Sequence, residues 1–149
     1  DDFTATRRRE GEKLVALILD RVASMESLVE TVKPKIPALV AAYQEKLTLR
    51  LKEAMLNTED DRLRQEFALF AQKIDVDEEI GRLQTHMAEL RRIVKTGGAV
   101  GKRLDFLLQE LNREANTLGS KSVSSDVSQT AMELKVLIEQ IREQIQYIE

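Results

Sequence analysis

Side chains that could bind a divalent metal ion recur at helical spacing between residues 75 and 86. Asp75, Glu79, Arg82 and His86, the only histidine of the chain, are separated by steps of four, three and four positions. Because an α-helix turns by about 100° per residue, these side chains share one stripe of a helix. Carboxylates and a neutral imidazole bind hard divalent ions such as Mg²⁺ or Mn²⁺, and an arginine can clamp phosphate oxygens. The stripe is therefore suited to metal-assisted phosphodiester chemistry.

A second polar stripe lies in the segment GKRLDFLLQELNREANTLGSKS, residues 101–122. It consists of Asp105, Gln109, Asn112 and Asn116, with Arg113 and Thr117 beside it. Asparagine competes for its own backbone and is a poor helix former, whereas a merely solvated face would more usually carry Glu, Lys, Gln or Arg. The two asparagines therefore suggest that this stripe has a function.

The sequence TGGAVG, residues 96–101, lies between the two stripes and predicts a turn between helices. In an antiparallel hairpin around this turn, residues whose numbers sum to about 196 lie level. The pairs that this register places level are His86 with Glu110, Arg82 with Glu114, and Glu79 with Thr117. Such a hairpin would bring the histidine, several carboxylates and the arginines into one site.

Each of these features also has an ordinary explanation. A lone histidine on a charged helix is often only solvated or hydrogen-bonded, and charged pairs such as Glu78 with Arg82 are common on exposed helices. The segment 82–103 carries six basic residues and one acidic residue, which is either a solvated cationic end or a surface that follows phosphates. TGGAVG lacks the lysine and the preceding strand of a phosphate-binding loop, so it is interpreted as a turn.

The composition is typical of long packed helices rather than of a sheet protein. The chain has no Trp, two Pro, two Tyr and four Phe, and 33% of its residues are charged. The absence of Cys excludes a disulfide scaffold and a Cys-ligated zinc or iron–sulfur site. No apolar run approaches the roughly 20 residues of a membrane span, and the net charge of −3 argues against indiscriminate binding to nucleic acid.

Apolar seams and turn residues predict an all-α fold, an elongated antiparallel helical bundle or coiled-coil hairpins of about five helices. The predicted helices span about residues 3–32, 37–56, 60–95, 101–118 and 125–148. The fourth and fifth have regular seams, at Leu104, Leu108, Leu111, Ala115 and Leu118, and at Val127, Ala131, Leu134, Ile138, Ile141, Ile145 and Ile148.

Proline, glycine and helix-capping residues set the expected boundaries of the helices. Pro34 and Pro37 separate the first two helices. The third helix begins with a seam at Leu63, Phe67, Phe70 and Ile74, and its register skips before Val76. Gly119 is expected to end the fourth helix in the left-handed conformation, and Ser125 or Asp126 is expected to cap the fifth.

Three long blocks of the sequence resemble the C-terminal region of the YicC family of bacterial proteins. They are KIDVDEEIGRLQTHMAELRRIV, VGKRLDFLLQELNREANTLGSKS and the terminal ELKVLIEQIREQIQYIE. The opening DDFTATRRREGEKL is similar to the family's middle segment. Because family members begin with a further region of mixed secondary structure, the resemblance implies that residues 1–149 are one helical domain from the C-terminal part of a longer chain.

The resemblance also implies an activity. Family members are cytoplasmic endoribonucleases that require manganese or magnesium, act on single-stranded or structured RNA including small regulatory RNA, and assemble as ring-like oligomers. The expected cofactor is therefore Mn²⁺ or Mg²⁺, and the expected partners are RNA and further copies of the chain, as a hexamer in the full-length protein. No membrane partner is expected.

On this interpretation the two polar stripes supply the site. The expected catalytic residues are His86, Glu79, Glu110 and Glu114, and the expected metal ligands are these four with Asp75. The expected RNA- and phosphate-binding residues are Arg82, Arg103, Arg113, Asn112, Asn116, Thr117 and Lys121. The asparagines would orient ligands or contact ribose 2′-hydroxyl groups.

Alternative hypotheses stay open. The chain could be a non-catalytic oligomerisation module whose polar stripes fix helix register, or an RNA-binding module without catalysis. In a metal-free variant of the nuclease hypothesis, His86 promotes attack by the RNA's own 2′-hydroxyl and leaves a 2′,3′-cyclic phosphate.

Overall fold

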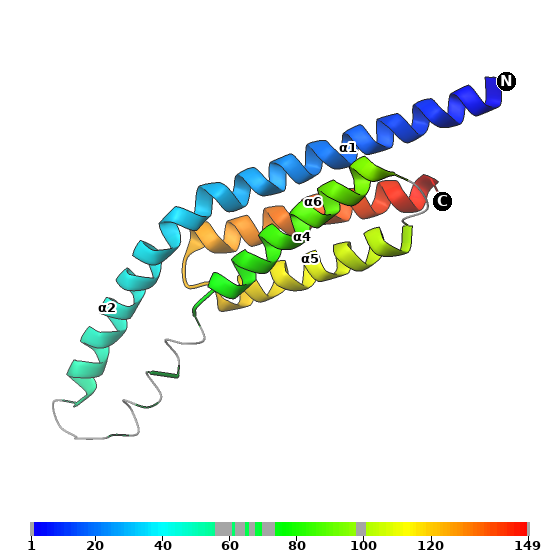
Figure 1. Cartoon of the computed structure of the whole chain (residues 1–149). Coiled ribbons are helices and arrows are strands. Elements are labelled where there is room, and N and C mark those ends of the chain that lie inside the picture. The colour runs from blue at the N-terminus through cyan, green and yellow to red at the C-terminus, as the bar shows by residue number, and fades with distance from the viewer. Residues whose placement is uncertain are drawn as a thin grey trace.

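The described part of the computed structural model comprises residues 2–55, 61, 65, 68–69, 74–97 and 101–148. Its elements are α1 (Asp2–Val32), the 3₁₀ turn η1 (Lys33–Lys35), α2 (Ile36–Met55), α4 (Asp77–Thr96), α5 (Gly101–Lys121) and α6 (Ser125–Ile148). Figure 1 shows their arrangement. The predicted all-α class is confirmed, since no strand occurs in these residues. None of the helices searched is both long and apolar enough to cross a membrane.

Four of the helices form an antiparallel bundle. Helix α1 packs against α6 and α4, and α5 packs against the same two helices from the other side (Figure 1). The α4–α5 pair and the α1–α6 pair therefore lie on opposite sides of the bundle. Residues 97–100 separate α4 from α5, and residues 122–124 join α5 to α6.

The core of the bundle is made by the predicted apolar seams. The seam residues from Leu104 to Leu118 and from Val127 to Ile145 are all buried, and the side chain of Ile148 lies outside the described part of the structure. In α1, Val22, Met25 and Val29 are also fully buried. Each side chain of this kind contributes about 1.5–3 kcal/mol relative to an exposed position. Helical periodicity therefore determines which face of each helix enters the core.

Helices α1 and α2 extend the molecule beyond the bundle. The first turns of α1 are exposed and project past the other helices (Figure 1). Pro34 lies in the first turn of η1, so the chain changes direction there as predicted, and α2 leaves the bundle at an angle. Among the described elements, α2 has its main contacts with η1.

The predicted single helix from residue 60 to 95 is wrong at its centre. Asp75 and Val76 are not helical, and α4 begins at Asp77. The Asp75 carboxylate accepts a hydrogen bond from the Asp77 backbone N–H at 3.0 Å, a local bond that competes with the helix. Ile74 and Val76 are two positions apart, so they could not face the same side of a continuous helix. The break allows both side chains to be buried. The predicted seam positions Leu63, Phe67 and Phe70 lie outside the described residues.

Two predicted boundaries of α5 and α6 are also corrected. Helix α5 continues through Gly119 to Lys121, and a Cβ on Gly119 would lie 3.4 Å from that of Ala131, so this glycine lies close to α6. The described glycine with a positive φ, 75°, is Gly97 at the end of α4. Helix α6 is capped by Ser124 rather than by Ser125 or Asp126, because the Ser124 hydroxyl accepts the Val127 N–H at 3.2 Å.

Candidate functional site

The α4–α5 hairpin brings the two polar stripes together in the predicted register. Arg82 Nε donates a hydrogen bond of 2.9 Å to Glu114 Oε1, which confirms the predicted pairing of these residues. His86, Glu110 and Glu114 each offer one ligand atom, and these atoms lie within 4.8 Å of one another. These three residues form a ligand triad contributed by both helices of the hairpin.

The ligand triad is chemically suited to a divalent ion. It combines an imidazole nitrogen with two carboxylates, a donor set that Mn²⁺ accepts. Metal–ligand distances of about 2.0–2.4 Å require ligand atoms that nearly converge, and a small side-chain movement would bring these three around one ion. His86 and Glu110 are half-buried and Glu114 is buried, so the triad is only partly exposed to solvent.

Arg82 holds Glu114 beside the triad. Its hydrogen bond with Glu114 raises the pKa of Arg82, burial opposes the shift, and the charge of Glu114 adds to it, as do Glu78 and Glu79 to a smaller extent. Arg82 NH1 lies 3.5 Å from the Glu78 carboxylate and NH2 lies 3.9 Å from that of Glu79. The guanidinium therefore stays charged and links Glu114 to the start of α4.

Two predicted metal ligands are not brought into the triad. Glu79 is completely buried, and its carboxylate oxygens lie 2.8 and 3.3 Å from Lys121 Nζ. The Asp75 carboxylate accepts the backbone bond at the break before α4, while its carbonyl accepts a 3.4 Å bond from Lys121. Lys121, predicted to bind phosphate, is thus engaged in joining the end of α5 to the start of α4.

The predicted RNA-contacting residues in the middle of α5 differ in their exposure. Asn112, Asn116 and Arg113 are exposed, and neither amide makes a hydrogen bond to another side chain in the described part of the chain. The hydroxyl of Thr117, a half-buried side chain, donates to the Arg113 carbonyl at 3.0 Å. The amides are therefore free to meet a ligand arriving from solvent.

A basic groove of about 440 Å³ begins at His86 and runs between α4 and α5. It is lined by His86, Glu89, Ile93, Lys102, Arg103, Phe106 and Leu107. Arg103 NH2 lies 3.3 Å from Glu89 Oε1, and Arg92 also binds Glu89. The hydrogen bond from Arg92 lowers the pKa of Glu89, burial opposes this, and the charges of Arg92 and Arg103 assist it. Glu89 is therefore ionised and offsets part of the positive charge.

Phe106 is a residue of this groove that the sequence analysis missed. Its side chain is 59% exposed, although it is aromatic and lies within the leucine-rich segment of α5. A signal was present, because Phe106 falls outside the Leu104–Leu108 seam and follows Lys102 and Arg103. An aromatic residue off the seam next to a basic pair is a pattern of nucleic-acid contact surfaces.

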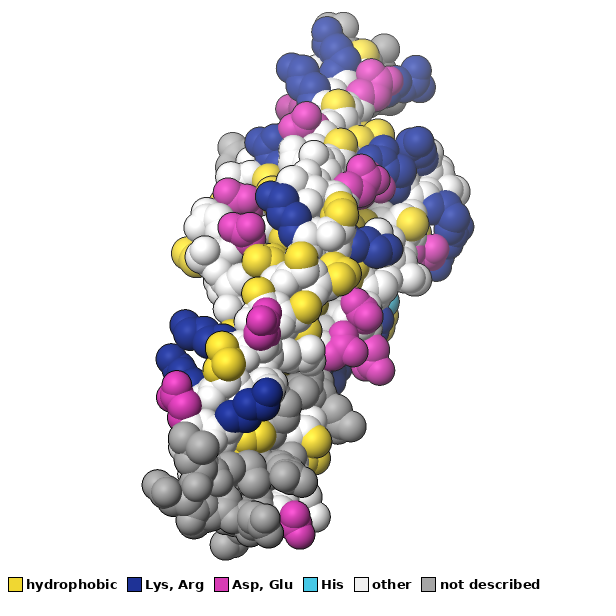
Figure 2. Space-filling view, turned by 90° about the vertical axis from the view of Figure 1, so that its left-hand side faces the viewer, with side chains coloured by type: hydrophobic (Ala, Val, Ile, Leu, Met, Phe, Trp, Pro, Cys, Tyr) yellow, Lys and Arg dark blue, Asp and Glu magenta, His cyan; other side chains and the backbone are white. Residues whose placement is uncertain are grey.

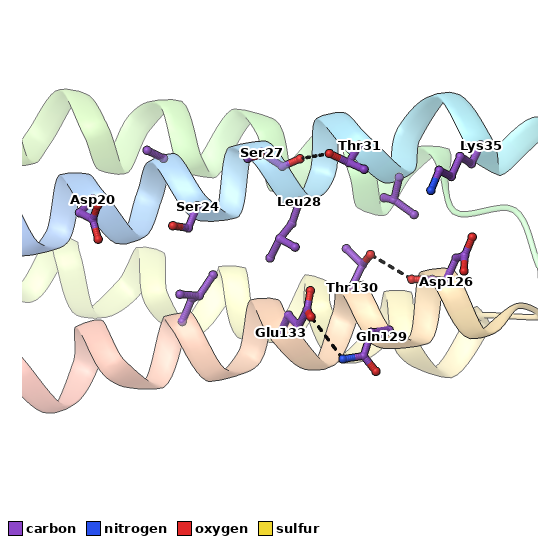
Figure 3. A pocket seen from close by; sticks show the side chains of 13 residues that line it. Asp20, Ser24, Ser27, Leu28, Thr31, Lys35, Asp126, Gln129, Thr130 and Glu133 are labelled. Atoms are coloured by element: carbon purple, nitrogen blue, oxygen red, sulfur yellow. Dashed lines mark hydrogen bonds between the residues drawn. The ribbon is translucent and has the colours of Figure 1, made fainter.

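A larger hollow, of about 750 Å³, lies between α1 and α6 on the opposite side of the bundle (Figure 3). Many of its polar side chains are satisfied within their own helix, as where Thr31 donates to the Ser27 carbonyl and Gln129 to Glu133. Among the described residues that line it, Lys35 is the only basic one. The chemistry predicted from the sequence is therefore not placed in this hollow.

The face at the α2 end of the molecule does not carry an extended basic surface either. Figure 2 shows basic and acidic side chains interspersed there, with hydrophobic side chains between them, over the residues that are coloured. Lys102 and Arg103 are grouped with His86 in the basic groove between α4 and α5.

Comparison with known proteins identifies the family to which these helices are similar. Residues 32–149 match the family model described as "Endoribonuclease YicC-like, C-terminal". The chain is 51% identical over 148 residues to the probable endoribonuclease YicC of Haemophilus influenzae, which covers 99% of this chain and 52% of that protein. It is 38% identical over 146 residues to the probable endoribonuclease YicC of Clostridioides difficile, which covers 96% of this chain and 50% of that protein. The chain spans about half the length of the curated relatives it matches.

Proposed function

Because this chain belongs to the YicC-like endoribonuclease family, we propose that it carries the metal-binding part of an endoribonuclease that hydrolyses RNA phosphodiester bonds. The observation that carries the proposal is the convergence of His86, Glu110 and Glu114 within 4.8 Å beside a basic groove. Two separate helices contribute to the triad, so it exists only in the folded hairpin.

The triad residues would hold one Mn²⁺ or Mg²⁺ ion. When bound, such an ion supplies Lewis-acid activation of the scissile phosphate and of the attacking water. Glu110 and Glu114 provide the negative charge that attracts the ion, and Arg82 orients Glu114 through their 2.9 Å hydrogen bond. His86 occupies the end of the triad that opens into the basic groove, where the RNA would enter.

The basic groove and the outer face of α5 would bind the RNA backbone. Arg103 and Lys102 line the groove and would contact phosphates of an RNA bound there. Arg113, Asn112 and Asn116 are exposed further along α5 and would contact phosphates or ribose 2′-hydroxyl groups.

The remaining predicted residues are not proposed as metal ligands or as direct RNA contacts. Glu79 is completely buried against Lys121, and the Asp75 carboxylate accepts the Asp77 N–H where α4 begins, so their contacts favour a structural role that supports the triad. Thr117 is bonded within its own helix and would contact RNA only after rotating its hydroxyl. A homo-oligomeric assembly and a cytoplasmic location remain predictions.

A cleavage assay tests the proposal directly. A mixed-sequence RNA is incubated with this chain, and with the protein extended to the length of its relatives, in the presence of Mn²⁺ or of a chelator. We expect metal-dependent cutting that is abolished by His86→Ala, with a circular dichroism spectrum that is unchanged because His86 is half-buried on the helix surface. Unimpaired cleavage by His86→Ala in the longer protein would remove His86 from the mechanism.

The chemistry of the products separates two routes. Hydrolysis by activated water leaves a 5′- or 3′-phosphate, whereas attack by the RNA's own 2′-hydroxyl with His86 as base leaves a 2′,3′-cyclic phosphate. Only the second route should survive the chelator. The exposed edge of His86 in the basic groove is compatible with either route, so the products decide.

A second candidate function is favoured by the ion pairs between α4 and α5. Arg82 with Glu114 and Lys121 with Glu79 join the two helices and would fix their register in a non-catalytic oligomerisation or RNA-binding module. That function requires no affinity for metal. Calorimetric titration with Mn²⁺ showing no binding, together with salt-dependent RNA binding without turnover, would select it.

A further inference from the structure

The basic groove contains an exposed aromatic ring that neither the fold nor the ligand triad uses. Phe106 is 59% exposed, and the other large hydrophobic side chains exposed in the described residues are aliphatic. Its neighbours on α5 at Lys102, Asp105 and Gln109 are also exposed and polar. A surface that packs against another helix would present further apolar side chains here, so the surroundings of Phe106 favour a ligand that is flat, apolar and attached to negative charge.

The order of residues along α5 matches one nucleotide and its two phosphates. Lys102 and Arg103 lie about one turn before Phe106, and Glu110 of the ligand triad lies one turn after it. At 1.5 Å per residue the ring is about 6 Å along the helix from Glu110. A phosphate on Arg103 and a phosphate at the triad would therefore flank a base that lies over Phe106.

The opposite wall of the groove is compatible with such a ligand. His86, Glu89 and Ile93 of α4 face this part of α5 across a space of about 440 Å³, within the range of about 300–1,000 Å³ that is usual for small-ligand pockets. The negative charge of Glu89 is paired with Arg92 and Arg103, so it does not leave an unpaired anion facing a phosphate.

We propose that Phe106 is a stacking platform that seats one unpaired RNA base and thereby positions the adjacent phosphodiester at the ligand triad. The inference rests on the proposed endoribonuclease function and adds a positioning residue to it. A base inside a duplex is stacked on its neighbours and cannot cover the ring, so the platform selects unpaired RNA at the position next to the cut.

The platform can be observed by fluorescence, because the chain contains no tryptophan. Phe106→Trp introduces a single reporter, and stacking of a base on its indole quenches the emission. The probe is a short oligouridylate, titrated in the presence of a chelator so that no metal-dependent cleavage occurs. The matched control is Met132→Trp on α6, at a side chain that is 63% exposed and outside the groove.

We expect saturable quenching of the Phe106→Trp protein by the single strand, little quenching by a duplex of equal length, and no specific quenching of the control. Phe106→Ala should weaken single-strand binding about tenfold, the order of effect that alanine substitution has at stacking platforms. Phe106→Tyr should retain the affinity of the wild type. In the cleavage assay, Phe106→Ala should lower the rate on single-stranded RNA while leaving Mn²⁺ affinity unchanged.

Two results overturn the inference. Phe106→Ala binding the single strand as tightly as wild type would remove the platform, as would a change in sedimentation of Phe106→Ala showing that the ring packs against another copy. The proposed function fails separately. Quenching without any metal-dependent cleavage would leave the platform on a non-catalytic RNA-binding module, whereas cleavage without quenching would leave the nuclease and remove Phe106 from it.

Discussion

Replacing Lys121 by methionine should destabilise the chain, because it leaves the buried Glu79 carboxylate without its closest partner. Glu79 is 0% exposed, and Lys121 Nζ approaches both of its oxygens, at 2.8 and 3.3 Å. Methionine keeps most of the aliphatic stem and removes the ammonium group. The substitution therefore tests the ion pair rather than the packing of the side chain.

The expected magnitude follows from the remaining contacts. Leaving a buried charge without its partner typically costs about 3–5 kcal/mol. Here Arg82 NH2 remains 3.9 Å from Glu79, and the Lys121 side chain is 32% exposed, so the lost interaction is partly screened by solvent. We therefore expect a loss of about 2–3 kcal/mol in the free energy of unfolding, or roughly 5–10 °C in Tm for a chain of this size.

Urea denaturation followed by circular dichroism measures this loss. The control is Lys135→Met on α6, an exposed lysine for which no ion pair exists among the described residues and whose replacement should cost less than about 0.5 kcal/mol. In a double-mutant cycle, adding Glu79→Gln should recover part of the loss, because the carboxylate charge is then removed together with its partner.

The refuting result is also informative about function. If Lys121→Met unfolds at the same urea concentration as wild type and the Lys135→Met control, the pairing with Glu79 does not stabilise the hairpin. If in addition it weakens RNA binding, then Lys121 contacts phosphate, as the sequence predicted. Reduced stability with unchanged RNA affinity would instead support the structural role.

Four further substitutions have expected outcomes. Gly81→Ala should raise the free energy of unfolding by about 0.5–1 kcal/mol, because this exposed glycine lies inside α4 and an added Cβ meets nothing within 4 Å. Gly97→Ala should lower the free energy of unfolding by about 1 kcal/mol, because Gly97 has a positive φ. Urea denaturation measures both changes, and equal effects would contradict the reasoning. Glu89→Gln should tighten binding of single-stranded RNA, because it releases Arg103 in the basic groove. The pKa of Glu89 is lowered from 4.5 in the folded chain, so the stability from its pairing is present above pH 4.5 and is lost as the pH falls through the folded pKa. The variant should lack this dependence, and denaturation at several pH values measures it. Arg103→Ala should lower the slope of log affinity for single-stranded RNA against log salt concentration by about 0.7–1, and an unchanged slope would exclude a phosphate contact.

The core and the hairpin register could be predicted from the sequence because both depend on local periodicity. Seam positions such as Leu111 and Leu134 are buried wherever a helix of this pattern packs on another helix. The few residues between α4 and α5 then restrict which residues of the two helices lie level. The sequence therefore predicts the pairing of Arg82 with Glu114 that the structure shows.

The features that could not be predicted depend on contacts between distant residues or on competition between local structures. The break at Asp75 requires a side-chain hydrogen bond to outweigh a helical turn, while both neighbouring apolar residues find space in the core. Lys121 lies one turn beyond the residue that the register places level with Glu79, and its long side chain reaches back across that distance. Sequence spacing alone cannot distinguish this reach from a lysine that extends into solvent.

The charged contacts of the hairpin explain how a repeating seam can support one defined site. Leu104, Leu111 and Leu118 are seven residues apart, so the apolar seam of α5 would match α4 about equally well after a slip of one heptad. Such a slip would move Glu110 about 10 Å along the helix, away from His86. Arg82 with Glu114 and Lys121 with Glu79 match in one register only, and leaving either buried carboxylate unpaired is costly. Arg82, Glu79 and Lys121, which lie outside the ligand triad, therefore help to determine that its two helices meet where a metal ion could bind.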